Sequence, residues 1–511
     1  MKSIKTIGII GAGAMGRGIA QIAAQAGIEV LLYDLDASAV ENARASLQQV
    51  WAKLVGKGKI TAELASESHD RVVPATALQD MSRADLVIEA VIERLDVKCE
   101  LFKQLEAIVS SDCILASNTS SLSITAMAQS CLHPARVAGF HFFNPVPLMK
   151  VVEVIDSLLG DPKTGDALMA LARTMGHTPV RAKDMPGFIV NHAGRGMSVE
   201  GLKTAQESVA PFYQIDAIMR EQAGFRMGPF ELLDLTGLDV SQPAMESIYQ
   251  QFYDEPRFRP SPIAASRFAG RLLGRKTGEG FYRYPDGQKQ SPDEPAVPAL
   301  PADLKVWLAP FHSVGHRRAA ALLKTLGATV VAAETPPDDA LIMITPYGED
   351  AASVAGSHQL DAERTVALDT FFGLEQGKRR VLMCTLATLP KWRDAAHALL
   401  ASDGTAVSVI DDSAGFVGQR IAATIVNIAC DIAQQGIATP ADIDQAVALG
   451  LGYPKGGPLG LGDSLGVTHI LEILRTLQRT TGDMRYRPSP WLQRRALLGL
   501  SLRTEAACVA R

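Results

Sequence analysis

A histidine and a glutamate, twelve positions apart, could carry out acid–base chemistry. His141 ends an apolar run, a Pro-rich turn follows, and Glu153 lies in the next apolar run, residues 150–155. Two consecutive strands joined by a rigid turn can bring an imidazole and a carboxylate together, and the carboxylate then stabilises the charged ring. The pair predicts a general base, His141, with Glu153 as its partner. A structural histidine beside a solvated glutamate is the alternative.

Two further polar residues could orient a substrate. Ser120 lies in the polar run 118–121, and Asn191 follows the sequence Pro-Gly-Phe-Ile-Val (186–190), where a loop enters a predicted long helix. The Ser120 hydroxyl can donate to or accept from a substrate oxygen, and the Asn191 amide could lie at the site entrance. A turn-capping serine and a helix-start asparagine are the alternative interpretations.

A glycine-rich turn near the N-terminus predicts a dinucleotide site. An apolar run, residues 5–10, leads into Gly-Ala-Gly-Ala-Met-Gly, and a helical stretch and a second apolar run that ends in Asp34 follow. The glycines permit a tight turn, close approach of backbone N–H groups to a pyrophosphate, and close packing of helix on strand. Asp34 would bind ribose hydroxyls and repel a 2′-phosphate, which predicts NAD. The predicted NAD-binding residues of the turn are Gly11, Gly13, Ala14, Met15 and Gly16. A ligand-free glycine turn is the alternative.

Lys53 and Lys57 lie four positions apart on a predicted helix. They therefore share one helix face. Two ammonium groups could hold phosphates, such as those of coenzyme A, whereas a solvated basic face is the more common arrangement.

Strand-like and helical stretches alternate around these residues, as a doubly wound α/β domain requires. Further strand-like runs fall at residues 85–91, 113–117 and 136–141. Helical stretches fall at residues 37–57 and 96–109. Ligands bind at the carboxyl ends of such strands. Glu93, residues 118–121 and His141 all follow or end predicted strands. The first half is therefore predicted to be a Rossmann-type domain with its site at this edge.

Composition excludes several classes of protein. The chain has 511 residues, of which 47% are hydrophobic and 21% charged. These values are near the globular average and exclude disorder and fibrous repeats. A net charge of −5 gives no bulk attraction to nucleic acid or anionic lipid. No apolar run approaches the roughly 18 residues that span a bilayer, and the first apolar run leads into a glycine turn, unlike a signal peptide.

The cysteines are scattered and contain no CxxC pair, so we expect reduced thiols, no metal site and a cytoplasmic location. They are Cys99, Cys113, Cys131, Cys384, Cys430 and Cys508.

Five segments together resemble the NAD-dependent 3-hydroxyacyl-CoA dehydrogenases, over residues 4–285: GAGAMGRGIA, EAVIERLDVK, ASNTSSLSIT, GFHFFNPVPLMKVVEVI and PGFIVN. The resemblance implies that His141 is the base and Glu153 its partner, and that Ser120 and Asn191 contact the substrate. It also implies that Lys53 and Lys57 face the CoA phosphates. The residues that it assigns to NAD, besides the glycine turn, are Asp34, Glu93, Lys98, Asn118, Ser120 and Asn144.

The acyl chain is less clearly indicated. The family usually has a basic residue after the position of Asn191, where this chain has His192 and then a glycine-rich helix. The long tandem form resembles the 3-hydroxyadipyl-CoA dehydrogenases of phenylacetate catabolism, and 3-hydroxybutyryl-CoA is the competing substrate. An adipyl tail ends in a carboxylate, for which Arg195 is a candidate partner. A dehydrogenase of a free hydroxy acid and a non-catalytic NAD- or acyl-CoA-binding protein remain alternatives from other classes.

The second half of the chain repeats the first. The sequence Tyr-Arg-Pro-Ser-Pro at 486–490 repeats residues 258–262, and residues 414–417 repeat residues 186–189, both with an offset of 228. The repeat predicts a second helical domain after a degenerate Rossmann-like one. The second copy is expected to be inactive, because residues 310–316 lack the three glycines, Thr385 stands in place of the base and Gln419 replaces Asn191.

The expected architecture thus has an α/β Rossmann domain, an all-α domain, a degenerate αβ segment and a second all-α domain. Stacking of the two helical domains would form a pseudo-dimer within one chain, and a homodimer is the alternative. The predicted boundaries are 1–186 for the NAD-binding domain, 187–284 for the helical substrate and dimerisation domain, 285–302 for a linker, 303–410 for the degenerate domain and 411–511 for the second helical domain.

Overall fold

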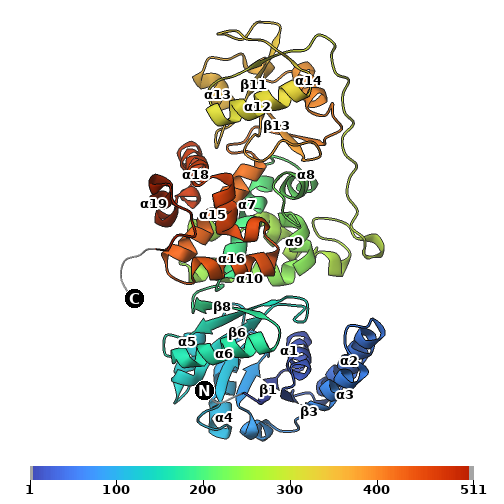
Figure 1. Cartoon of the computed structure of the whole chain (residues 1–511), viewed down its shortest axis with the longest axis vertical. Helices are drawn as coiled ribbons and strands as arrows, with labels where there is room; N and C mark the ends of the chain where they lie inside the picture. The colour runs from blue at the N-terminus through green and yellow to red at the C-terminus, as the bar shows by residue number, and fades with distance from the viewer. Residues whose placement is uncertain (1–3, 506–511) are drawn as a thin grey trace. The chain divides into compact units, whose positions relative to one another are not determined.

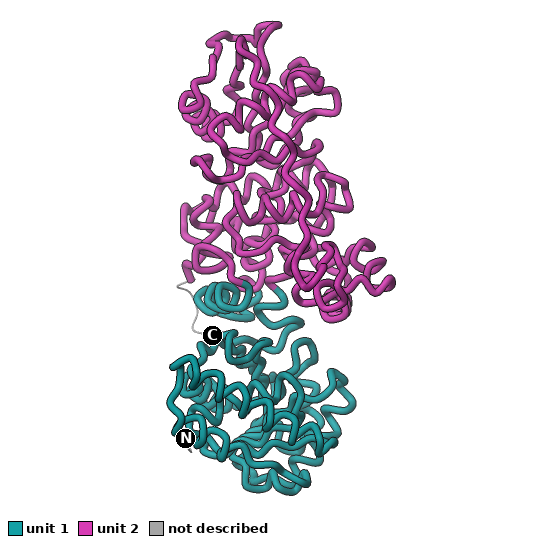
Figure 2. Tube along the Cα trace, turned by 90° about the vertical axis from the view of Figure 1, so that its right-hand side faces the viewer, with its two compact units in different colours: residues 1–192, 435–451 teal, residues 193–434, 452–511 magenta. Residues whose placement is uncertain are grey.

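The computed structural model describes residues 4–505 and contains two compact units (Figures 1 and 2). Unit 1 comprises Met1–His192 and Gln435–Leu451, and unit 2 comprises Ala193–Gln434 and Gly452–Arg511. Cys508, and the outermost residues of the predicted first and last domains, lie outside the described residues. The other five cysteines are free thiols. Within the described range, every helix is too short or too polar to cross a membrane.

Unit 1 is built on an eight-stranded sheet in the order β3-β2-β1-β4-β5-β6-β7-β8. Neighbouring strands are parallel, except that β6 and β7 are antiparallel. This confirms the predicted Rossmann-type fold, although β3 and β8 were not predicted. The strands are β1 Thr6–Ile10, β2 Glu29–Tyr33, β3 Val72–Pro74, β4 Leu86–Glu89, β5 Ile114–Ser117, β6 Val137–Phe142, β7 Val151–Asp156 and β8 Thr178–Lys183.

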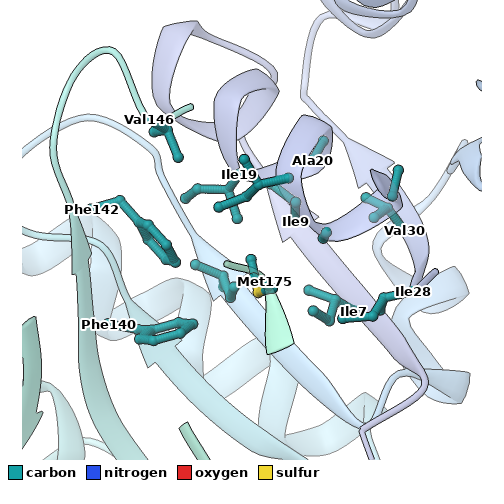
Figure 3. Packing of buried hydrophobic residues seen from close by; sticks show 14 of the residues in the cluster. Ile7, Ile9, Ile19, Ala20, Ile28, Val30, Phe140, Phe142, Val146 and Met175 are labelled. Atoms are coloured by element: carbon teal, nitrogen blue, oxygen red, sulfur yellow. The ribbon is translucent and has the colours of Figure 1, made fainter. Parts of the chain in front are cut away.

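The helices of unit 1 bury apolar faces on this sheet. In Figure 3, Ile19 and Ala20 of α1 pack with Ile7 and Ile9 of β1 and with Val30 of β2. Side chains at several helix starts accept backbone N–H groups, as Asp36 does at α2. The helices are α1 Ala14–Gln25, α2 Ala37–Gly56, α3 Ala62–Asp70, α4 Leu95–Ile108, α5 Ile124–Gln129, α6 Pro162–Thr174 and α16 Pro440–Leu451.

Helix α16 comes from the second half of the chain but packs against β7 and β8. Just before it, the Ile437 carbonyl accepts the Lys183 N–H at 2.8 Å. A Cβ on Gly450 would lie 3.0 Å from Val190. A segment of the predicted second helical domain is therefore part of the compact unit that contains the first Rossmann-type sheet.

Unit 2 contains a six-stranded sheet in the order β10-β9-β11-β12-β13-β14. Strands β12 and β13 are antiparallel and β13 and β14 are parallel, as in the series β6, β7, β8. The strands are β9 Lys305–Leu308, β10 Thr329–Val330, β11 Ala340–Ile344, β12 Thr365–Leu368, β13 Arg380–Cys384 and β14 Val407–Ile410, and the helices of this αβ part are α12 Ser313–Thr325, α13 Ala351–Ser357 and α14 Pro390–Leu400.

The topology of this second sheet shows that the prediction for Thr385 is wrong. In unit 1 the antiparallel pair places His141 opposite Glu153. The matching pair β12–β13 places Asp369 opposite Val381, with the Asp369 N–H bonded to the Val381 carbonyl at 3.0 Å. Short buried strands look alike in sequence, and β6, β12 and β13 each follow or begin with an arginine. The strand pairing identifies β12 as the equivalent of β6, in agreement with the offset of 228 between His141 and Asp369. The second copy has Asp369 in place of the base.

Most of the rest of unit 2 is helical, apart from residues 288–304, which contain no helix. A Cβ on Gly196 of α7 would lie 2.8 Å from the Ile425 Cα of α15, so the absence of a side chain permits this close helix crossing. The helices are α7 Val190–Gln206, which begins in unit 1, α8 Phe212–Ala217, α9 Pro229–Thr236, α10 Leu238–Gln251, α11 Pro262–Ala269, α15 Val417–Gln434, α17 Pro458–Leu465, α18 Val467–Thr481 and α19 Pro490–Leu498.

Candidate active site

His141 and Glu153 form a buried pair on the adjacent strands β6 and β7. His141 Nδ1 lies 2.6 Å from Glu153 Oε2. The other carboxylate oxygen accepts the N–H groups of Ile189 at 2.9 Å and Val190 at 2.8 Å, where α7 begins. The positive end of a helix favours a carboxylate there. Because Nδ1 is committed to Glu153, proton exchange with a ligand would use Nε2 of His141.

The turn before α7 has an unusual backbone conformation. Phe188 has a φ of 47°, in the left-handed region that bulky residues rarely adopt. The Phe188 ring lies 5.8 Å from the imidazole of His141. Phe416, 228 positions later, has a φ of 46°, so the repeat preserves this turn where Val381 has replaced the glutamate. The turn directs two backbone N–H groups at Glu153 in the first copy.

Ser120 and Asn191, predicted to orient a substrate, are brought together. The Asn191 side-chain amide donates to the Ser120 carbonyl at 3.4 Å. Glu93 Oε1 accepts from the Ser120 N–H at 2.9 Å and from its hydroxyl at 3.3 Å. Three of the predicted residues therefore form one polar group.

Asn118 and Asn144 lie on the same edge of the sheet but make different contacts. The Asn118 side-chain oxygen accepts the Phe142 N–H at 2.8 Å, which ties the end of β5 to β6. Asn144 is exposed in the turn after β6, and its bond to Pro145 is cis. Asn118 thus has a positioning contact, whereas Asn144 presents its side chain to solvent.

The glycine turn fits a dinucleotide. Gly11 has a φ of 106°, and a Cβ there would lie 2.6 Å from the Ala90 carbonyl oxygen. A Cβ on Gly16 would lie 1.8 Å from the Gly11 carbonyl oxygen, whereas one on Gly13 would meet no atom within 4 Å. The open space at Gly13 adjoins the N-terminus of α1, which no side chain caps. A helix end of this kind binds phosphate, and its first turn holds Ala14 and Met15.

Asp34, at the end of β2, has a contact that the sequence did not predict. Its Oδ2 accepts the Ala12 N–H at 2.8 Å, so the carboxylate also holds the glycine turn in place. An acid at this strand end is where an adenosine ribose binds in folds of this type.

Lys98 is fully buried beside Glu93 and Glu89. Its ammonium lies 3.3 Å from Glu93 and 2.7 Å from Glu89. Burial acts to raise the pKa of Glu93, but Lys98 and the hydrogen bonds from Thr119 and Ser120 outweigh it and hold the pKa below its ordinary value. Glu89 was missed by the sequence analysis, although an acidic residue at the end of an otherwise apolar strand was a usable signal.

Lys53 and Lys57 both lie at the C-terminal end of α2. Lys53 is in the last turn of α2, and Lys57 directly follows that helix. Both side chains are exposed. Among the described residues neither has a carboxylate partner within 4.0 Å, and no hydrogen bond links them to the residues around His141. Two exposed ammonium groups without acidic partners suit a phosphate-bearing ligand.

In unit 2, larger or differently bonded side chains occupy the positions that correspond to Gly13 and His141. His312, at the position of Gly13, accepts the Gly315 N–H at 3.0 Å through Nδ1 and so caps α12 itself. Asp369 is fully buried and accepts from Gln419 at 2.9 Å and Gln222 at 3.1 Å, and burial raises its pKa. This arrangement supports the prediction that the second copy is inactive.

Comparison with known proteins follows the same division of the chain. The family model "3-hydroxyacyl-CoA dehydrogenase, NAD binding domain" matches residues 6–185. The model "3-hydroxyacyl-CoA dehydrogenase, C-terminal domain" matches twice, at residues 187–284 and 415–509. The second match includes the segment that carries α16, so it covers most of the predicted second helical domain.

Individual relatives extend over the whole chain or over its first half. The "3-hydroxyadipyl-CoA dehydrogenase" of Escherichia coli (strain K12) is 37% identical over 500 residues, 98% of each chain. The "Probable 3-hydroxybutyryl-CoA dehydrogenase" of Deinococcus radiodurans is 42% identical over 54% of this chain and 99% of its own. The crystal structure of an Escherichia coli 3-hydroxybutyryl-CoA dehydrogenase superimposes with a TM-score of 0.86 at 36% identity, covering 97% of this chain and 99% of that one.

Proposed function

Because the chain belongs to the 3-hydroxyacyl-CoA dehydrogenases, which are NAD-dependent oxidoreductases, we propose that its first half oxidises an L-3-hydroxyacyl-CoA to the 3-oxoacyl-CoA. The observation that carries this proposal is the buried pair of His141 and Glu153 on β6 and β7. It lies in the same unit as the glycine turn and the Ser120–Asn191 group. The family assignment confirms the expectation of NAD as cofactor.

In this proposal His141 Nε2 takes the proton of the substrate hydroxyl. Glu153 stabilises the resulting imidazolium, and the N–H groups of Ile189 and Val190 keep that carboxylate in place. Ser120 and Asn191 orient the hydroxyl. Bound NAD supplies a hydride acceptor for the carbon that carries this hydroxyl.

The residues that we propose to hold NAD surround the carboxyl ends of the first strands. The glycine turn and the N-terminus of α1 bind the pyrophosphate, and Asp34 binds the adenosine ribose. The full set proposed for NAD is Gly11, Gly13, Ala14, Met15, Gly16, Asp34, Glu93, Lys98, Asn118, Ser120 and Asn144. For the substrate, we propose that Lys53 and Lys57 bind the phosphates of CoA.

For the acyl chain we propose 3-hydroxyadipyl-CoA, with 3-hydroxybutyryl-CoA as the alternative. The name of the full-length relative from Escherichia coli supports the first, and the names of the half-length relative and of the solved structure support the second. An adipyl carboxylate needs a cationic partner. Arg195, on α7, is a candidate for this partner. Burial lowers the pKa of its guanidinium to about 10, and the nearby Tyr453 opposes the shift. The side chain therefore stays charged at neutral pH.

The test is NADH formation with 3-hydroxybutyryl-, 3-hydroxyhexanoyl- and 3-hydroxyadipyl-CoA. Activity that is highest with the adipyl ester and lost in His141→Ala supports the proposal, and a preference for the butyryl ester favours the alternative. His133→Gln, a change at an exposed histidine, is the matched control and retains activity. No turnover with any ester would contradict the enzyme proposal.

We further propose that the second half is a structural partner that makes the chain a pseudo-dimer. Arg257 from the first helical copy pairs with Asp431 of α15 at 2.7 Å. Its repeat equivalent, Arg485, pairs with Glu200 of α7 at 3.4 Å. Each arginine thus pairs with a carboxylate on the long helix of the other copy, as expected for a two-fold interface between like domains, although the two carboxylates are not equivalent positions of the repeat. We also keep, as proposals, the domain boundaries predicted from the sequence and a cytoplasmic location.

A further inference from the structure

Behind the Ser120 loop, five residues of unit 1 form a closed ring of polar contacts, which runs through four side chains and through both the backbone N–H and the hydroxyl of Thr119. Lys98 donates to both oxygens of Glu89, at 2.8 and 2.7 Å, and lies 3.3 Å from Glu93. The Ser117 hydroxyl donates to Glu89 and accepts the Thr119 N–H at 3.1 Å. The Thr119 hydroxyl donates to Glu93 at 2.6 Å and so closes the ring.

The ring is buried except at one member. The Lys98 and Glu89 side chains are 1% and 0% exposed, whereas Glu93 is 39% exposed. Ser117 and Thr119 are also buried. Buried charges are tolerated only where partners compensate their desolvation. Here Glu89 compensates Lys98 directly, and Glu93 is the single member that faces the outside.

The exposed member carries the loop that we propose to contact substrate and cofactor. One oxygen of Glu93 accepts the Ser120 N–H at 2.9 Å and the hydroxyls of Ser120 at 3.3 Å and Ser121 at 3.1 Å. Moving Glu93 would therefore displace the whole turn. The ring lies at the carboxyl ends of β4 and β5, the edge of a Rossmann sheet where dinucleotides bind.

We propose that Glu89 and Ser117 are positioning residues, which act through Lys98 and Thr119 to hold Glu93 and residues 119–121 against the nicotinamide end of the cofactor. This inference rests on the proposed function, which places Glu93 and Ser120 beside NAD. Neither Glu89 nor Ser117 touches a ligand in this proposal. The adenosine end, at Asp34 and the glycine turn, should not depend on the ring.

The experiment compares two ligands in the full-length chain. NADH spans the site, whereas ADP-ribose lacks the nicotinamide. In Glu89→Gln and Ser117→Ala we expect NADH to bind about tenfold more weakly, because a charge-assisted contact of the ring that supports the loop is lost. ADP-ribose binding should stay within about twofold of that of the unaltered protein. NADH fluorescence and titration calorimetry with ADP-ribose measure these affinities.

A matched control separates positioning from general stability. Glu106 and Arg136 form another mostly buried ion pair in unit 1, 3.4 Å apart. Glu106→Gln should lower the melting temperature but leave both affinities unchanged. If Glu89→Gln fails to fold, Ser117→Ala still tests the inference, because it keeps the charges of Lys98 and Glu89 and removes only one hydroxyl.

Two outcomes would overturn the inference: unchanged NADH binding in both variants, or equal weakening of NADH and ADP-ribose. Failure of the proposed function would look different. The unaltered protein would then bind both nucleotides but oxidise no 3-hydroxyacyl-CoA, and the comparison of the two ligands would still decide what the ring does.

Discussion

His141 and Glu153 are direct register partners on β6 and β7, and their side chains meet at 2.6 Å. In the part of unit 1 that the structure describes, these strands are the one antiparallel pair of the sheet. An antiparallel pair can follow a short turn, whereas a parallel pair needs a long crossover. The reversal thus allows two residues close in the sequence to face each other at the carboxyl end of an otherwise parallel series.

Replacing Glu153 by Gln tests the role of its charge. We expect kcat to fall by about 10²–10⁴-fold, because an amide cannot stabilise an imidazolium and can hold the ring in the wrong tautomer. NADH binding should stay within about twofold, since the change removes no proposed cofactor contact. Steady-state kinetics and NADH fluorescence check both. Glu100→Gln, at an exposed position, is the control, and an unchanged kcat in Glu153→Gln would contradict the role of the pair.

Replacing Lys53 and Lys57 together by Ala tests the proposed CoA contact. We expect the KM for a 3-hydroxyacyl-CoA to rise about tenfold or more, because two charge-assisted phosphate contacts are lost. The difference in KM between the variant and the unaltered protein should be smaller at high ionic strength, because salt screens the lysine charges of the unaltered protein. Helix α2 should persist, since alanine favours helices. Lys103→Ala, on the exposed face of α4, is the control. An unchanged KM would instead favour a substrate without CoA.

Asp216 predicts how stability depends on pH. Burial raises its pKa from 3.8 to about 7, although Tyr282 and two backbone N–H groups at the start of α9 oppose the shift. The folded state therefore keeps a proton that the unfolded state loses near pH 4. This contribution to stability is complete below pH 3.8 and is lost as the pH rises toward about 7. The free energy of unfolding should fall by up to about 4 kcal/mol over this range.

Denaturant unfolding at pH 5 and pH 7 measures this dependence. Asp216→Asn lacks the titrating group, so its stability should fall less between the two pH values than that of the unaltered protein. Parallel curves for the two proteins would show that Asp216 titrates in its ordinary range.

Arg420 tests the contact between the two helical copies. Its guanidinium pairs with Glu200 at 2.9 Å and with Glu207 at 2.6 Å, and the Glu200 carboxylate is fully buried. Arg420→Met should reduce the free energy of unfolding by about 3–5 kcal/mol, because it leaves a buried charge without its main partner. Denaturant unfolding checks this, with Arg494→Met, at an exposed arginine, as control. Equal stability of the two variants would contradict a tightly packed pseudo-dimer.

The residues of the site differ in how far local sequence could predict them. The glycine turn, the His141–Glu153 pair and the Ser120 loop follow from motifs of a few residues with a local physical purpose. Strand β3 was missed because it has only three residues, and β8 because its six residues include Pro, Arg and Lys, and both lie at the edges of the sheet. The error at Thr385 has a different origin. Two buried strands have similar sequences, and the offset of 228 between the repeats, which pairs Asp369 with His141, distinguishes them. The order of strands in the sheet agrees with that offset.

The amino-acid sequence by itself determined the family, the NAD motif and the identity of the proposed base, since each depends on residue types at fixed spacing. Only the tertiary structure decided that Glu89 and Ser117 support the Ser120 loop, that α16 packs on the first sheet, and that the buried Asp369 is held by Gln419 and Gln222. These are contacts between residues far apart in the chain. Their partners are chosen by burial and strand pairing, which no local pattern records.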